Sequence, residues 1–160
     1  MKKIKENNIM DEMVKRTQVY LNAMYGGNSG YEVIPENGIT GWTTIYALTR
    51  ALQIELGITA TADSFGPTTI SKFNSKFPNG IKQQNSSDTT ENNIYAIIQG
   101  ALWCKGYSTG ATGITKHFYS GTGGAVKKMK EDAGLTNTDS TVTLAVMKAL
   151  LSMNQYVTLT

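Results

Sequence analysis

The two halves of this 160-residue chain repeat one another, and this repeat limits the folds open to it. Short motifs recur in the same order at a nearly constant spacing: Gln18 matches Gln99, Gly38-Ile39-Thr40 matches Gly113-Ile114-Thr115, Leu56-Gly57-Ile58 matches Ala133-Gly134-Leu135, and Asp63-Ser64 matches Asp139-Ser140. Self-similarity at a fixed period indicates one supersecondary unit used more than once. We therefore expect two successive small units of the same plan.

In the first half, apolar residues recur at the spacing of amphipathic helices. The inward face of the first helix is predicted to carry Met10, Met13, Val14, Thr17, Leu21 and Met24. Glycines that tolerate a left-handed conformation follow this helix. A second helix is predicted from about Trp42 to Leu56, ending at Gly57. A third begins at Gly66-Pro67, because proline at the first helical position loses no hydrogen bond.

The second half has the same periodicity. The residues expected to face inward are Ile94, Ile97, Ile98, Ala101 and Leu102 in a fourth helix, Ala125, Val126, Met129 and Ala133 in a fifth, and Val142, Val146, Met147 and Leu150 in a sixth. The stretch from Pro78 to Asn93 is polar and cannot bury enough surface to order itself. The sequence predicts an all-α fold of two three-helix bundles, residues 1–80 and 93–160, joined by a polar linker at 81–92.

Charge and composition restrict the partners and cofactors. The formal net charge is only +3, whereas a protein that neutralises phosphates carries a denser basic patch, so no nucleic acid is expected. No stretch has the length of a transmembrane helix, so no membrane is expected. With Cys104 as the only cysteine and His117 as the only histidine, neither a disulfide within the chain nor a common zinc site can form. We expect no metal and no cofactor.

The motifs resemble those of peptidoglycan-binding three-helix domains of the PGBD-like type. In the first unit they are Gln18, Gly38 to Gly41, Ala47 to Gln53, Leu56 to Ile58 and Phe65 to Thr69. In the second they are Gln99, Leu102, Lys105-Gly106-Tyr107, Gly113-Ile114-Thr115 and Ala133-Gly134-Leu135. The second unit departs from the pattern, because it lacks the Phe-Gly turn before its third helix and carries Met129-Lys130 where the family has a Phe-Gln pair.

The resemblance implies a non-catalytic region that binds peptidoglycan, by its glycan or its stem peptide. Such tandem domains accompany peptidoglycan hydrolases, for example endolysins and autolysins of Gram-positive bacteria and their phages. The expected place is the bacterial cell wall, outside the cell. Residues 1–16 have no apolar core of a secretory signal, so export needs another route, such as release on lysis, or the sequence has been trimmed.

Two other classes of function, protein docking and DNA binding, are also compatible with small helical units. A helical interaction module would dock a catalytic domain or another protein, and three short helices can contain a DNA-binding motif, although the charge is low. Catalysis is not expected: candidate carboxylates at Glu55, Glu131 and Asp132 have no supporting motif, and nothing in the sequence brings Cys104 to His117 with a third residue that would orient the histidine.

Sugar rings stack on aromatic side chains, so the candidate ligand residues are aromatic and polar groups near loops. In the first unit they are Tyr25, Tyr31, Trp42, Thr43 and Tyr46, and in the second Trp103, Lys105, Tyr107, Phe118 and Tyr119. Each aromatic has a competing role in core or rim packing, and Trp42, at a helix start, is the strongest candidate. Two weak sites on one chain are predicted to raise retention on a repetitive polymer.

Overall fold

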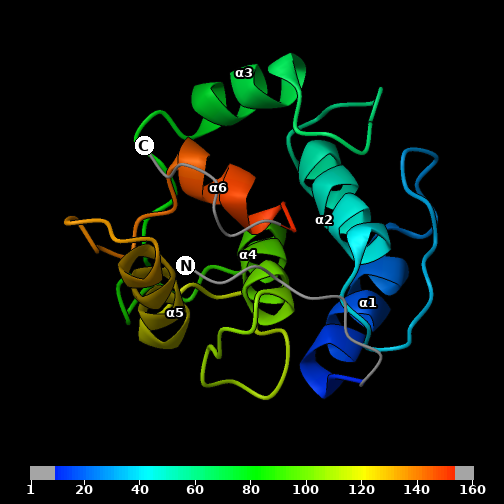
Figure 1. Ribbon diagram of the computed structural model, residues 1–160. Coiled ribbons are helices and arrows are strands. Elements are labelled where there is room, and N and C mark those ends of the chain that lie inside the picture. The colour runs from blue at the N-terminus through cyan, green and yellow to red at the C-terminus, as the bar shows by residue number, and fades with distance from the viewer. Residues whose placement is uncertain (1–9, 154–160) are drawn as a thin grey trace.

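The computed structural model describes residues 10–153 and contains six helices in this range. They are α1 (Glu12–Tyr25), α2 (Trp42–Glu55), α3 (Pro67–Lys76), α4 (Asn93–Cys104), α5 (Ser120–Asp132) and α6 (Leu144–Leu150). The predicted all-α class is confirmed, with three helices in each half of the chain (Figure 1). Residues 1–9, on which the expected lack of an export signal partly depends, lie outside the described range. No helix of the described residues is long and apolar enough to cross a membrane.

Local signals set the helix ends. Asp11 caps α1, and Asn92 caps α4 by accepting hydrogen bonds from backbone N–H groups of the first turn. Pro67 occupies the first turn of α3. Gly57 and Gly134 follow α2 and α5 with φ of +80° and +77°, a region that glycine enters without steric cost. The same expectation for the glycines after α1 is wrong, because Gly26 keeps a helical φ of −58° and Gly27 has no positive φ.

Hydrogen bonds confirm the internal repeat and show that the loop residues of the two halves align differently from the prediction. The N–H of Asp11 donates to the carbonyl of Gly38 (2.9 Å), and the N–H of Asn92 donates to the carbonyl of Lys116 (3.0 Å). Gly38 and Lys116 also share a positive φ, of +72° and +61°. The predicted match of Gly38 with Gly113 is therefore wrong: the equivalent position lies three residues later, at Lys116.

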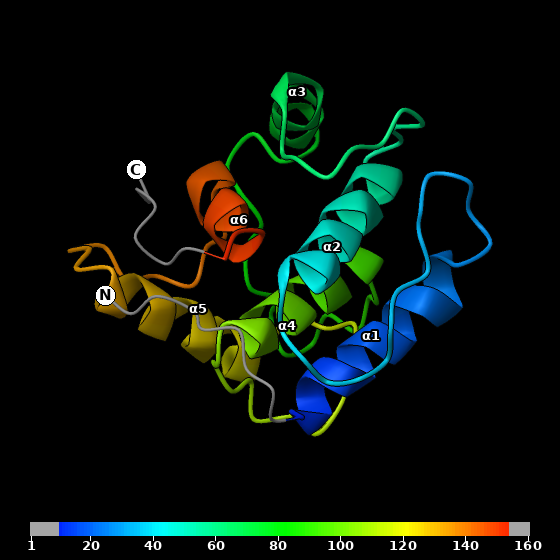
Figure 2. The same cartoon turned by 45° about the vertical axis from the view of Figure 1, so that its right-hand side comes forward.

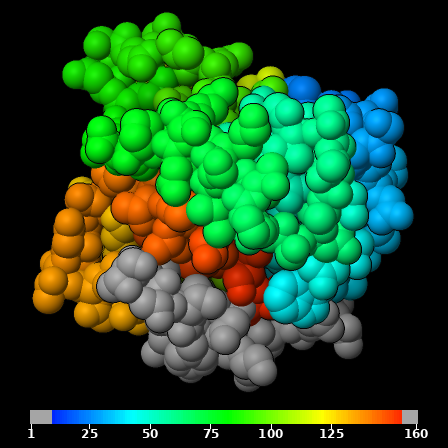
Figure 3. Space-filling model, turned by 90° about the horizontal axis from the view of Figure 1, so that it is seen from above, coloured from blue at the N-terminus to red at the C-terminus, as the bar shows by residue number. Residues whose placement is uncertain are grey.

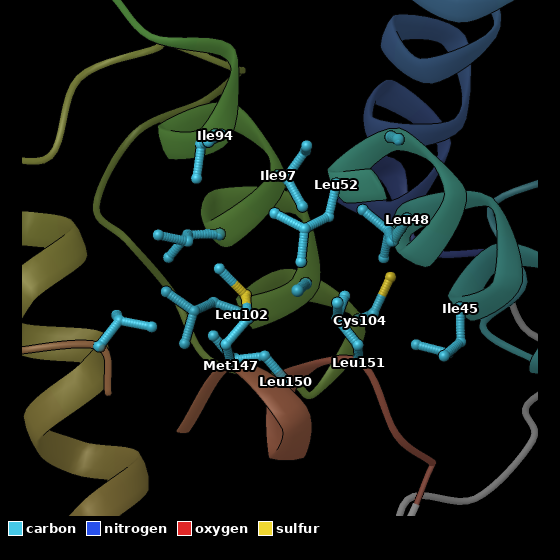
Figure 4. Packing of buried hydrophobic residues seen from close by; sticks show 14 of the residues in the cluster. Ile45, Leu48, Leu52, Ile94, Ile97, Leu102, Cys104, Met147, Leu150 and Leu151 are labelled. Carbon is cyan, nitrogen blue, oxygen red and sulfur yellow. The ribbon is translucent and has the colours of Figure 1, made fainter. Parts of the chain in front are cut away.

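Helix α4 lies at the centre of the molecule and joins its two halves. It packs against α1 and α2 of the first half and against α5 and α6 of the second (Figures 1 and 2). Leu48 and Leu52 of α2 point toward Ile97 of α4, and Leu102 of α4 meets Met147 of α6 (Figure 4). These side chains belong to one cluster of buried residues. The two units of the repeat thus share a core.

The helix α3 and the segment after it lie against the second half. The α3 helix packs on α6, and seen from above the green chain around α3 meets the orange and red chain around α6 directly (Figure 3). Ile81 forms an antiparallel bridge with Val142, with both N–H to carbonyl distances at 2.8 Å. Gln84 is buried, and its side-chain oxygen accepts a hydrogen bond from the N–H of Phe118 (2.7 Å).

The expectation that the polar stretch at 78–93 does not order itself is therefore wrong at Ile81 and Gln84. These two residues find partners in the second half of the chain, which local composition does not reveal. The domain boundaries at 80 and 93 stay a prediction.

Three details of the predicted helices differ in the structure. Met10 and Met24 are exposed, at 53% and 40%: Met10 precedes the first residue of α1, and Met24 lies outside the buried face of that helix. The helix α5 begins at Ser120, ahead of its first apolar residue, and includes three glycines in its first half. Val142 precedes α6, because its backbone pairs with Ile81.

Candidate ligand-binding site

Gln18 of α1 holds the loop between α1 and α2 in place. The side chain is buried at 1% exposure, and its oxygen accepts a hydrogen bond from the N–H of Gly38 (2.7 Å). Its nitrogen donates to the hydroxyl of Thr44 (3.0 Å) and to the carbonyl of Ile39 (3.3 Å). A buried amide with all these partners ties the loop to the first turn of α2. The loop is thus a rigid support for the residues beside it.

Trp42 and Tyr46 form an exposed aromatic pair at the start of α2. They lie four residues apart, which places them on one face of the helix. Their ring centroids are 5.5 Å apart with planes inclined by 27°, a stacked arrangement. Trp42 is 46% exposed and Tyr46 is 36% exposed, whereas most aromatic side chains of the described residues are buried or half-buried. The pair offers a flat apolar surface to solvent.

A hollow of about 250 Å³ lies next to this pair. Its lining combines polar and apolar groups: Gln18, Pro35, Asn37, Ile39, Thr40, Gly41, Trp42, Thr43 and Thr44. The volume is below the usual range for drug-sized ligands, which indicates a shallow site for about one sugar ring or a short side chain. The Trp42 ring can stack on the C–H face of a sugar while hydroxyl and amide groups of the lining bind its polar substituents.

The equivalent place in the second unit has no such surface. Counting from the shared Gly38 and Lys116 position, Trp42 corresponds to Ser120 and Tyr46 to Gly124. The backbone of Thr109 lies so close to Gly121 that a side chain there would collide with it. Gln99 still holds its loop as Gln18 does, with its nitrogen 2.7 Å from the Thr115 hydroxyl. The second unit therefore keeps the glutamine that holds the loop, but it has no aromatic side chains at the positions of Trp42 and Tyr46.

The structure brings Trp42, Thr43 and Tyr46 together and separates the other predicted residues from them. Tyr25, Tyr31 and Trp103 are buried, at 3%, 7% and 5% exposure. Of these, Tyr25 donates a hydrogen bond to Glu55 (2.8 Å), and Tyr31 donates one to Asn22 (2.8 Å). Lys105 is buried at 6% exposure, and its ammonium donates to the carbonyl of Ser152. These side chains stabilise the interior.

Two further predicted residues of the second unit lie at its surface with partners of their own, and a third is fully buried. Tyr107 donates a hydrogen bond to Asp132 (2.7 Å), and Tyr119 donates to the carbonyl of Asp88 (2.6 Å). The Tyr119 ring stacks on His117 with centroids 5.0 Å apart. Phe118 is 0% exposed. Among the described residues, no group of three or more His, Cys, Asp and Glu side chains could hold a metal ion.

Sequence reasoning missed Pro35, Asn37 and Ile39 in the lining of the hollow. The match between Gln18 and Gln99 could have located the loop, because a glutamine repeated in an apolar helix face needs polar partners. Only the tertiary structure shows which loop supplies them. Outside the lining of the hollow, at the half-buried Tyr20, burial and then the charge of Glu55 raise the pKa to about 12.

Known proteins resemble the first half of this chain and, in two cases, nearly all of it. Residues 9–83 match the family described as FadG/YbfG, PGDB-like domain. The chain is 53% identical over 150 residues to uncharacterized protein FadG of Bacillus subtilis (strain 168), which is 94% of this chain and 25% of FadG. It is 50% identical over 148 residues to uncharacterized protein YbfG of the same organism, which is 92% of this chain and 19% of YbfG. No solved structure matches it.

The matched range 9–83 contains α1, α2, α3, Gln18, and the Trp42 and Tyr46 pair. The chain spans about a quarter or less of the length of these two relatives. The family match and the three-helix arrangement around Gln18 agree on the type of the first unit. Residues 9–83 are therefore a PGDB-like domain of the FadG/YbfG family.

Proposed function

We propose that this chain binds peptidoglycan without catalysis, through the Trp42 and Tyr46 pair and the hollow beside it. The observation that carries the proposal is the exposure of two stacked rings at the start of α2, beside a loop that Gln18 makes rigid. An aromatic surface exposed to water has an energetic cost that a sugar face offsets when it stacks there. The family match over residues 9–83 supports peptidoglycan as the source of that sugar.

The finer proposal concerns the rest of the protein. The relatives FadG and YbfG are much longer than this chain, so the region is proposed to hold a larger protein at the bacterial cell wall. A linked peptidoglycan hydrolase, as in endolysins and autolysins, is the proposed partner. Because the second unit lacks an exposed aromatic pair, we propose one main binding site per chain in place of two equal sites. The proposed boundaries of the repeat remain 1–80 and 93–160 for the two units and 81–92 for the linker.

The test measures co-sedimentation of the full chain with purified sacculi treated with protease. Trp42→Ala removes the stacking surface, so we expect binding about tenfold weaker. Val33→Ala is the matched control, because Val33 is a 66% exposed apolar residue of the same loop. Binding of Trp42→Ala equal to that of Val33→Ala would exclude the Trp42 site. Circular dichroism verifies that both variants keep their helices.

The second candidate is a module that docks a linked catalytic domain, since the same exposed rings suit a protein surface. In that case the chain would not sediment with sacculi and would bind only the purified partner domain. Trp42→Ala would then weaken the protein complex and leave sacculus recovery at the background level.

A further inference from the structure

A second concavity lies between the two units, away from the lining of the Trp42 hollow. It has a volume of about 270 Å³ and is formed by α1 together with the loop that precedes α5. Its residues are Glu12, Lys15, Arg16, Val19, Tyr20, Gly113 and Ile114. Val19, Tyr20 and Ile114 give it an apolar floor, and Val19 is 42% exposed. We call this concavity the inter-unit groove.

Cations surround the inter-unit groove. Lys15 and Arg16 line it, and the ammonium of Lys116 lies 5.9 Å from the centroid of the Tyr20 ring. Glu12 is the one carboxylate in the lining, and it contacts Arg16 at 3.5 Å. Three cations and one carboxylate leave a net charge of +2 around an apolar floor. Such a surface suits a ligand that carries carboxylates on a small apolar body.

The backbone of Lys116 is strained. Its φ of +61° is the only positive φ of a non-glycine residue among the described residues, and the first unit has Gly38 at the equivalent position. A left-handed conformation is unfavourable for a lysine, because its Cβ comes too close to a carbonyl oxygen, whereas glycine has no Cβ. Strain of this kind concentrates at binding sites. Here the strained residue is the one whose ammonium lies over an aromatic ring of the first unit, that of Tyr20.

We propose that the inter-unit groove binds the stem peptide of peptidoglycan, with Lys15 and Lys116 taking its carboxylates and the floor taking its alanine methyl groups. This inference rests on the proposed function, because it assigns a second part of the same polymer to the same chain. An apolar floor favours a peptide over a polyphosphate, which offers no methyl groups to bury. With the glycan bound at Trp42 and the stem peptide bound in the inter-unit groove, residues of both units would contact the same polymer.

The test uses the full chain and soluble stem peptides released from purified peptidoglycan by an amidase, with binding followed by chemical-shift changes or calorimetry. Lys116→Gly removes the cation and relieves the backbone strain, so the fold is kept. We expect it to bind the peptides at least about fivefold more weakly. Lys82→Gly is the matched control, because Lys82 is an exposed residue outside the helices. Lys15→Gln is a second variant that changes no backbone.

Equal affinity of Lys116→Gly and Lys82→Gly, with Lys15→Gln unchanged, would overturn the proposal. So would saturable binding of teichoic acid at the groove without binding of the peptide. A parallel experiment uses glycan strands from which the peptides have been removed. Loss of glycan binding in Trp42→Ala tests the proposed function separately, so failure of the groove and failure of the Trp42 site give different results.

Discussion

Two neighbouring buried groups, Lys105 and Cys104, make the stability of the fold depend on pH. Burial lowers the pKa of Lys105 from 10.5 to about 8. Burial raises the pKa of the Cys104 thiol from 9.0 to about 12, although a hydrogen bond with Thr40 and the charge of Lys105 oppose the change. In both cases the low dielectric of the interior penalises the charged form.

The free energy of unfolding is predicted to rise between pH 8 and pH 9. In that interval folded Lys105 loses its proton while the unfolded residue keeps it, so the unfolded state binds more protons and stability rises by about 1 kcal/mol. Urea unfolding at the two pH values measures this change. Lys105→Met is expected to abolish the rise, and an unchanged rise in this variant would contradict the assignment.

Above pH 9 the thiol acts in the opposite direction. The unfolded thiol, with its ordinary pKa of 9.0, ionises before the folded thiol, so the folded state holds the extra thiol proton and this group lowers stability as pH rises. The rise from Lys105 continues toward its ordinary pKa of 10.5, so the two effects oppose each other between pH 9 and pH 10. Cys104→Ala is expected to make the free energy of unfolding rise more steeply over this interval, measured by the same urea titrations. The same pH dependence in the variant and in the unchanged chain would contradict the assignment to the thiol.

At the scale of elements, the close crossing of α1 and α4 depends on Gly100. A side chain at this position would meet Cγ2 of Thr17 at 2.5 Å. Thr17 is 1% exposed and its hydroxyl donates to the carbonyl of Met13 (2.9 Å), so it has little freedom to move. The glycine therefore sets how closely the first helices of the two units approach.

Gly100→Ala is predicted to destabilise the fold despite the higher helix propensity of alanine. Overpacking costs about 1–3 kcal/mol, and the gain in propensity is about 1 kcal/mol. Thr17→Ser removes Cγ2 and keeps the hydroxyl, so the double variant should recover most of the loss. Thermal unfolding of the four proteins in a double-mutant cycle measures the coupling. Additive losses would show that the two residues do not meet.

At the scale of the molecule, α4 joins the two units in one core, so we expect them to unfold together. Leu102 is 0% exposed, and α4 contacts α1, α2, α5 and α6. Leu102→Ala is expected to cost about 2–5 kcal/mol. Because the core is continuous, protection from hydrogen exchange should fall together in α2 and α5. Loss of protection confined to α5 and α6 would mean that the units unfold separately, and Val33→Ala serves as the surface control.

Local order is largely readable from the chain itself. The apolar period in α1, α2 and α4 and the glycines after α2 and α5 are properties of neighbouring residues, so they predict helices and their ends. The repeated glutamines at Gln18 and Gln99 likewise predict two units of one plan. The Trp42 position was predictable for the same reason, since an aromatic residue at a helix start beside Gly41 lies next to a loop.

The sequence by itself determined the helices, their order and the duplication, because these follow from interactions within a few residues. The tertiary structure decided which aromatic rings face water, and it did so through contacts distant in sequence. Tyr25 and Tyr31 are buried by partners on other segments, while Trp42 and Tyr46 stay 46% and 36% exposed. The tertiary structure also decided that the two units share a core. The apolar residues of α4 predict a helix with buried faces, but only the packing shows that it contacts helices of both units.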